Sequence, residues 1–163
     1  MLTQPKIELR SPMHYAALRA QVPIPFGDVL GPMWGKVARW LADQGLTPAG
    51  PPFIRYLTTD MASKLDIEVG FPVTAALAGD EHISTGAFPA GRFATADYFG
   101  DYSGLMEATA ALLDWAKTNR VTWQTSIVNG VERWAARIEF YPTDPAAEPD
   151  PAKWQTQLAI LTV

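Results

Sequence analysis

Glu139 has the clearest potential for chemistry in this sequence, because it lies in a run of apolar and aromatic residues. The segment VERWAARIEFYPTDP, residues 131–145, places it directly before Phe140 and two positions before Tyr141. An unpaired carboxylate away from water is strongly unfavourable, so it finds a partner or takes up a proton. We consider three explanations: a bound ligand, an internal ion pair with Arg137, and a strand face that is open to water.

The spacing around Glu139 determines which side chains can act with it. If residues 137–144 form a strand, Glu139 and Tyr141 share one face and Phe140 lies on the other. Arg137 is on the same face as Glu139, about 7 Å along the strand. The carboxylate and the phenol therefore point the same way, and Arg137 is an internal cation that could neutralise Glu139.

Two amphipathic helices are predicted among the elements that must position these residues. The first runs from about residue 32 to residue 44, with Pro32 at its first position and Gly45 available to end it. The second lies between Gly104 and Asn119, and its apolar residues recur at helical spacing. The two patterns resemble each other, which suggests an internal repeat.

The predicted strands repeat as well. The alternating segment 64–73 aligns without a gap with 153–163, and each is preceded by another strand. The strands of the first unit are 13–22, 52–60 and 64–73, and those of the second are 91–99, 137–144 and 153–163, with a linker near 74–86. We predict an α+β fold in which two pseudo-symmetric strand-helix-strand-strand repeats form one antiparallel sheet, with both helices packed on it and a ligand cleft at the seam.

The composition argues against several classes of protein. The net charge of −4 and a pI of about 5.1 argue against a nucleic-acid partner. The chain has no cysteine, and His14 and His82 are far apart, so we predict no metal site; no motif indicates a cofactor. There is no signal-like or membrane-spanning apolar segment, so we expect a cytoplasmic protein without a membrane partner.

Three signals together resemble the GyrI-like small-molecule-binding superfamily, also called the AraC effector-binding domain type. They are the duplicated unit, the segment WLADQGLTPAGPPFIRY at 40–56, and the ending IEFYPTDPAAEPDPAKWQTQLAI at 138–160. The resemblance implies a single ligand-binding domain over 1–163, with repeats at about 5–75 and 86–163 that form a cradle. Members are often the sensing half of multidrug-responsive transcription regulators, and others stand alone.

The resemblance also implies a role for Glu139. The triplet Glu139-Phe140-Tyr141 matches the family's glutamate two residues before a tyrosine, which points into an aromatic pocket and meets lipophilic organic cations. The aligned triplet of the first repeat is Ile54-Arg55-Tyr56. The pocket would therefore hold a single glutamate and two pseudo-equivalent tyrosines, Tyr56 and Tyr141. Arg137 departs from the family pattern.

Further aromatic residues are candidates for the same pocket. Phe26 and Tyr102 occupy corresponding loops before the two helices, at the expected mouth of the seam, where they could grip a flat ligand. Trp34 and Trp40 lie at core spacing, so each could pack in the core or line the cleft. All of these residues, and the two tyrosines, could also be ordinary packing residues.

Three functions from different classes remain open. The first is a stand-alone binding protein for amphipathic, mainly cationic aromatic compounds, acting in sensing or sequestration. The second, implied by stand-alone relatives, is hydrolysis of cyclopropane-bearing aromatic natural products, with Glu139 as base and Tyr141 or Tyr56 as donor. The third is inhibition of a protein partner such as DNA gyrase. The first strand begins by about residue 6, which leaves no room for a helix-turn-helix, so direct DNA binding is not expected.

Overall fold

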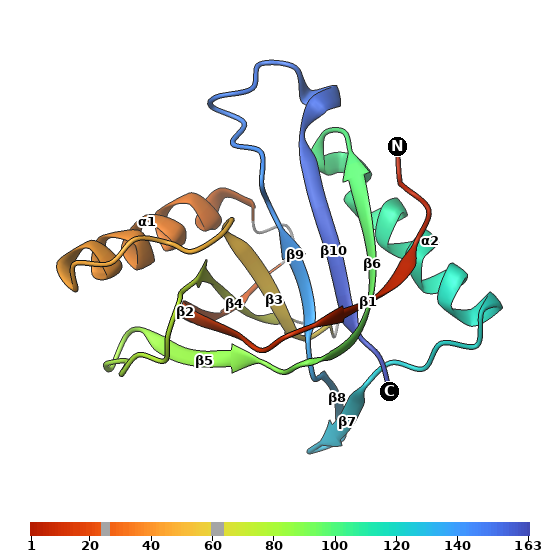
Figure 1. Ribbon diagram of the computed structural model, residues 1–163, viewed down its shortest axis with the longest axis horizontal. Coiled ribbons are helices and arrows are strands. Elements are labelled where there is room, and N and C mark those ends of the chain that lie inside the picture. Colours follow the sequence, from red (N-terminus) through yellow and green to blue (C-terminus); the bar gives the residue numbers. More distant parts are fainter. Residues whose placement is uncertain (24–26, 60–63) are drawn as a thin grey trace.

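The structure, a computed structural model, describes residues 1–23, 27–59 and 64–163. It contains two α-helices, α1 (Gly27–Asp43) and α2 (Leu105–Thr118), and two short 3-10 helices, η1 (Tyr102–Gly104) and η2 (Pro151–Lys153). The strands are β1 (Lys6–Arg10), β2 (Met13–Val22), β3 (Phe53–Thr58), β4 (Leu65–Pro72), β5 (Ser84–Phe88), β6 (Gly91–Phe99), β7 (Thr125–Val128), β8 (Val131–Trp134), β9 (Arg137–Phe140) and β10 (Gln155–Leu161). Figure 1 shows their arrangement.

Eight of the strands form one antiparallel sheet, in the order β1-β6-β10-β9-β3-β4-β2-β5, and β7 and β8 form a separate hairpin. The helices pack on this sheet, with α1 over the half that holds β2 and β4, and α2 over the half that holds β6 and β10. In Figure 1 they lie on either side of the β9 and β10 pair. The predicted α+β fold with two helices on one antiparallel sheet is confirmed.

The strand order confirms that the two halves are related by an approximate twofold axis, because it is unchanged when β1 is exchanged with β5, β2 with β6, β3 with β9 and β4 with β10. The central strands β3 and β9 pair with Ile54 opposite Glu139. On their other sides Ile54 pairs with Val69 and Glu139 pairs with Leu158, which are aligned residues of the two terminal strands, so the axis passes beside Ile54 and Glu139. Glu139 therefore lies at the centre of the sheet, where the two halves meet.

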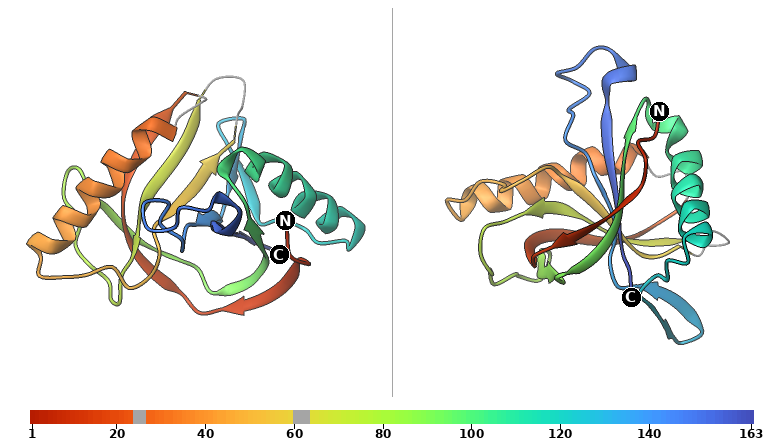
Figure 2. Two further views of the ribbon diagram at one scale, coloured as in Figure 1. Left: turned by 90° about the horizontal axis from the view of Figure 1, so that it is seen from above. Right: turned by 45° about the vertical axis from the view of Figure 1, so that its right-hand side comes forward.

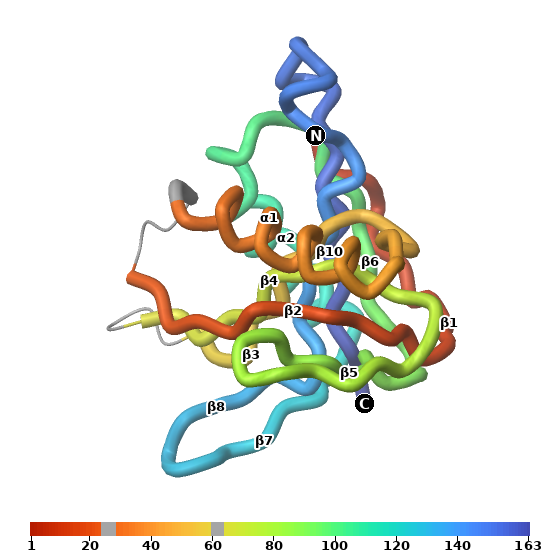
Figure 3. The backbone as a smooth tube through the Cα atoms, turned by 90° about the vertical axis from the view of Figure 1, so that its left-hand side faces the viewer, coloured from red at the N-terminus to blue at the C-terminus, as the bar shows by residue number. Residues whose placement is uncertain are grey.

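Each half contributes its first strand to the other half. β1 pairs with β6 of the second half, and β5 pairs with β2 of the first half. The links from β1 to β2 and from β5 to β6 are only two residues long, 11–12 and 89–90, so the sheet curls on itself (Figures 2 and 3). The concave side holds a core rich in aromatic residues, including Tyr15, Phe53, Phe88, Phe93 and Phe140.

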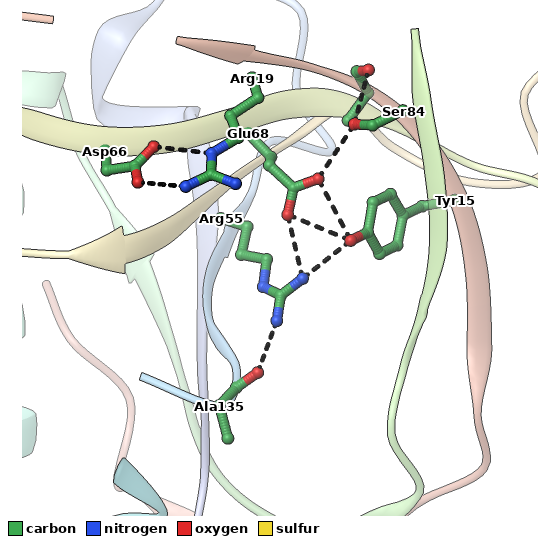
Figure 4. Close-up of polar contacts among 8 residues, drawn as sticks. Tyr15, Arg19, Arg55, Asp66, Glu68, Ser84 and Ala135 are labelled. Atoms are coloured by element: carbon green, nitrogen blue, oxygen red, sulfur yellow. Dashed lines mark hydrogen bonds and ion pairs between the residues drawn. The ribbon is translucent and has the colours of Figure 1, made fainter. Parts of the chain in front are cut away.

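The concave side also encloses a charged pair that the strand pattern did not indicate. The alternation of 64–73 places Asp66 and Glu68 on a polar face, but the curl of the sheet buries both. Arg55 pairs with Glu68 at 3.0 Å and donates 2.8 Å hydrogen bonds to the Tyr15 hydroxyl and the Ala135 carbonyl (Figure 4). Burial raises the pKa of Tyr15 to about 12, so its hydroxyl stays protonated and can donate to Glu68.

Several predicted bounds were wrong. The first helix begins at Gly27 rather than at residue 32, so Pro32 lies inside α1 and not at its first position. The strand predicted at 137–144 ends at Phe140, just before the residue that precedes Pro142, whose ring nitrogen has no proton to donate. The predicted linker 74–86 contains the start of β5, which follows a turn in which the Asp80 carboxylate accepts bonds from two backbone N–H groups. Within the described residues, no helix is long and apolar enough to cross a membrane.

Candidate functional site

Glu139 lies on the helix-facing side of β9, at the centre of the sheet. It pairs with Ile54 of β3, and the two side chains point to the same face of the sheet. Ile54 packs against residues of α1, so this face is the one that the helices cover. The Tyr141 hydroxyl donates a hydrogen bond of 2.5 Å to Oε2 of Glu139. Glu139 is half-buried as a residue, and burial removes its carboxylate from water.

Burial raises the pKa of the Glu139 carboxyl, because the charged form loses its hydration. Hydrogen bonding from Tyr141 and Tyr56 and the positive charge of Arg137 act in the opposite direction, but they do not cancel the effect of burial. Burial, and then the charge of Glu139, raise the pKa of both tyrosines well above the ordinary value. Both phenols therefore stay protonated and can donate hydrogen bonds to the carboxylate.

Four aromatic side chains, which we call the aromatic row, cross the seam beside Glu139. Trp34 on α1 lies with its ring centroid 5.5 Å from that of Tyr141, and Tyr141 lies 5.9 Å from Tyr102 on η1. Tyr102 in turn lies 5.1 Å from Trp154, with 35° between the ring planes. The indole of Trp34 is fixed by a 3.1 Å hydrogen bond to the Phe53 carbonyl. The row thus connects the helix of the first half with η1 and the residue before β10 in the second half.

The structure brings together most of the candidate residues from the sequence. Glu139, Tyr141 and Tyr56 are neighbours, and Trp34 and Tyr102 contact Tyr141 in the aromatic row. Phe26 lies outside the described residues. Trp40 lies apart from the row, since its indole donates a 3.1 Å hydrogen bond to Asp80. The described residues contain no cluster of three or more His, Asp or Glu side chains that could hold a metal ion.

Trp154 is the residue of this site that the sequence reasoning missed. Its indole is held by a 2.8 Å hydrogen bond to the Glu148 carbonyl, and its ring packs against Tyr102. A signal for it was present, because the gapless match of the two terminal strands aligns Trp154 with Leu65 of the first half. Leu65 is a core residue, and a much larger indole at the equivalent position of the second half indicates a contact that the first half lacks. This contact is the packing of Trp154 against Tyr102.

Arg137 lies near Glu139 but does not form an ion pair with it among the described residues. Its guanidinium lies over the ring of Trp134, 4.6 Å from the centroid. Burial lowers the pKa of Arg137, and the charge of Glu139 partly compensates. Arg137 therefore does not neutralise the Glu139 carboxylate by direct contact in this structure. Burial of the carboxylate also argues against the explanation that Glu139 lies on a strand face open to water.

Two surface pockets of about 530 and 510 Å³ lie elsewhere. The first lies between α2 and the β7–β8 hairpin, and the second lies near the link from β1 to β2; their described linings include neither Glu139 nor a member of the aromatic row. The aromatic row lies at the seam, and Tyr102, 40% exposed, is a ring of this row at the surface.

Nearly the whole chain matches one protein family. The model of the GyrI-like small molecule binding domain matches residues 3–161. The chain belongs to this family. Among proteins of curated function, none matches the chain significantly. The resemblance inferred from the duplicated unit is thus confirmed, and the chain is a GyrI-like small-molecule-binding domain.

Solved structures share the GyrI-like fold at low sequence identity. The EcmrR C-terminal domain has a TM-score of 0.72 and 19% identity, covering 98% of this chain and 97% of that one. In an EcmrR–DNA complex, the TM-score is 0.77 at 19% identity, and the match covers 98% of this chain but 57% of the EcmrR chain. SAV2435, solved bound to tetraphenylphosphonium, has a TM-score of 0.62 and 7% identity, over 99% and 94% of the two chains.

Proposed function

We propose that this GyrI-like domain binds amphipathic organic cations that carry aromatic groups, for sensing or sequestration. The observation that carries the proposal is the position of Glu139: a half-buried carboxylate at the twofold centre, with a raised pKa and a row of four aromatic rings beside it. An aromatic cation can offer the carboxylate a charge and the rings a partner for stacking. The structure of SAV2435 with tetraphenylphosphonium, an aromatic cation, supports this choice of ligand class.

Binding of this kind involves both the rings and the carboxyl proton. The ligand packs its aromatic groups against the aromatic row. Its positive charge stabilises the ionised form of Glu139, so the pKa of the carboxyl falls on binding. Tyr141 and Tyr56 keep their protons and orient the carboxylate toward the ligand.

A charge-removing substitution tests this proposal. We expect Glu139→Gln to weaken the binding of tetraphenylphosphonium by about 1–3 kcal/mol, because the Coulomb attraction between the carboxylate and the cation is lost, while neutral triphenylphosphine oxide changes much less. Isothermal titration of both ligands against both proteins measures the difference, with thermal melts to confirm that the variant is folded. Equal losses for the cation and the neutral compound would contradict a counter-charge role for Glu139.

The raised pKa of Glu139 and its contact with Tyr141 favour a second candidate, a hydrolase. Glu139 would then take a proton from water, and Tyr141 or Tyr56 would donate a hydrogen bond to the leaving group of a reactive, cyclopropane-bearing aromatic compound. Incubation with such compounds, followed by chromatography, distinguishes the two functions. Turnover that Glu139→Gln abolishes supports the hydrolase, and a stoichiometric complex without product supports binding alone.

A further inference from the structure

Arg10 holds a positive charge at the open end of the curled sheet, away from Glu139. It is the last residue of β1, and its guanidinium lies 5.6 and 5.8 Å from the ring centroids of Phe93 and Phe140. Nη2 donates hydrogen bonds to Gln157, at 2.7 Å, and to Glu8, at 3.2 Å. The side chain of Arg10 remains 18% exposed, so this charge is positioned by the protein and is also accessible from solvent.

A pocket of about 510 Å³ opens beside this guanidinium. It lies where the link from β1 to β2 meets the end of β4 and the end of β9. Its apolar lining includes Met13, Pro51, Val73 and Phe140, and its polar lining includes Arg10, His14 and Gln157. An apolar cavity with a few convergent polar groups, at the mouth of a curled sheet, is a common form of small-molecule site.

The pocket lies at the ends of the strands, and its described lining does not include Glu139. Phe140 follows Glu139 directly on β9, and neighbouring side chains of a strand point to opposite faces. Phe140 packs in the concave core, whereas Glu139 faces the helices. A ligand in this pocket would therefore have no contact with the Glu139 carboxylate.

The guanidinium has donors available for such a ligand. Both of its hydrogen bonds to protein use Nη2, and within the described part of the chain Nε and Nη1 have no hydrogen-bond partner. Each of these two nitrogens forms a two-pronged edge of the guanidinium only together with Nη2, so a carboxylate that binds both of its oxygens takes the place of Glu8 on Nη2. Glu8, whose side chain is 39% exposed, already shares this charge, so a bound carboxylate competes with the Glu8 side chain.

We propose that this pocket is a second ligand site, which takes a flat aromatic carboxylate. The carboxylate binds Arg10, and the aromatic body packs between Phe140 and the apolar wall formed by Met13, Pro51 and Val73. The two faces of β9 then bind ligands of opposite charge: an organic cation at Glu139 and an organic anion beside Phe140.

The test uses 2-naphthoate, with neutral 2-naphthamide as its isostere. We expect Arg10→Gln to weaken naphthoate binding about tenfold or more and to leave the amide almost unchanged, because the lost contact is to a charge. Glu8→Gln should strengthen naphthoate binding several-fold, since it removes the competing carboxylate. The Glu8 variant keeps the proposal testable if the Arg10 variant fails to fold, and isothermal titration measures both.

Two controls separate this site from the one at Glu139. Glu139→Gln should leave naphthoate binding unchanged, and Glu8→Gln should leave tetraphenylphosphonium binding unchanged. In NMR titrations, naphthoate should shift the signals of Met13 and Val73 rather than those of Trp34. Naphthoate binding that is insensitive to both Glu8→Gln and Arg10→Gln, or shifts confined to the Glu139 face, would overturn the proposal without bearing on cation binding at Glu139.

Discussion

The Tyr141 hydroxyl donates a 2.5 Å hydrogen bond to Glu139, two residues earlier in the chain. The carboxylate that is proposed to meet a ligand is thus held by its own strand neighbour, and the ring of that neighbour also contacts Trp34 and Tyr102. A movement of Tyr141 changes the hydrogen bonding of Glu139 and the aromatic row together. Tyr141 therefore couples the hydrogen bonding of Glu139 to the packing of the aromatic row.

Tyr141→Phe should move the pH dependence of cation binding upward. The hydrogen bond from Tyr141 lowers the pKa of Glu139, so its loss makes the carboxyl take up a proton at higher pH. Because only the ionised form attracts the cation, the midpoint of tetraphenylphosphonium binding should rise by about one pH unit or more. Titrations between pH 4 and pH 8 measure it. Tyr102→Phe makes the same chemical change elsewhere in the row, and an equal shift in that variant would contradict the assignment.

Glu139→Gln should change how stability depends on pH. Burial raises the pKa of Glu139 in the folded chain above the value of about 4.3 expected in the unfolded chain. Between these two values the folded chain binds more protons, so the free energy of unfolding falls as the pH rises through this window and is flat above it. Glu139→Gln lacks this pH-dependent loss of stability. The melting temperature of the variant minus that of the wild type should therefore be larger at pH 7 than at pH 4. A difference that is the same at both pH values would show that Glu139 ionises normally.

Arg137→Gln should strengthen cation binding. Arg137 is a half-buried positive charge on the same face as Glu139, and a bound cation experiences its repulsion. At pH 8 we expect a several-fold gain for tetraphenylphosphonium and little change for triphenylphosphine oxide. Arg39→Gln, at an exposed position of α1, is the control for a change in net charge alone. A loss of cation affinity in Arg137→Gln would mean that Arg137 supports the site instead.

Arg55→Met should destabilise the fold strongly without acting on the Glu139 face. The substitution leaves the buried carboxylate of Glu68 without its cation, which costs about 3–5 kcal/mol in comparable cases. Urea unfolding measures the loss. The control is Arg39→Met: Arg39 is exposed on α1 and forms no ion pair with another described residue, so its removal leaves no buried carboxylate unpaired and should cost about 0.5 kcal/mol or less. Similar losses for the two variants would show that the concave side is more open to water than the structure indicates.

The features that could be predicted from the sequence are those that depend on the spacing of apolar and polar residues along one strand or helix. The strand predicted over residues 137–144 placed Glu139 and Tyr141 on a shared face, and the gapless match of the two terminal strands indicated the twofold axis. The exchange of β1 and β5 could not be predicted, because local pattern does not specify which strand is the hydrogen-bonding partner. The local pattern does not contain the curl that this exchange produces, so Glu68 has the pattern of a solvent-facing residue in the sequence although the fold buries it. No local pattern indicates the pocket beside Arg10 either, because its lining comes from distant parts of the chain.

The exchange of first strands has the geometry of two identical half-chains that each complete the sheet of the other. In such a symmetric pair, the residues at positions 54 and 139 would be the same, and they face each other directly across the axis. Two glutamates there would repel each other at close range. A single buried carboxylate on the axis therefore requires that the halves differ in sequence, which is possible in one continuous chain and impossible in a homodimer of halves. Ile54 is as much a part of this arrangement as Glu139, because it is the residue that keeps the centre of the sheet singly charged.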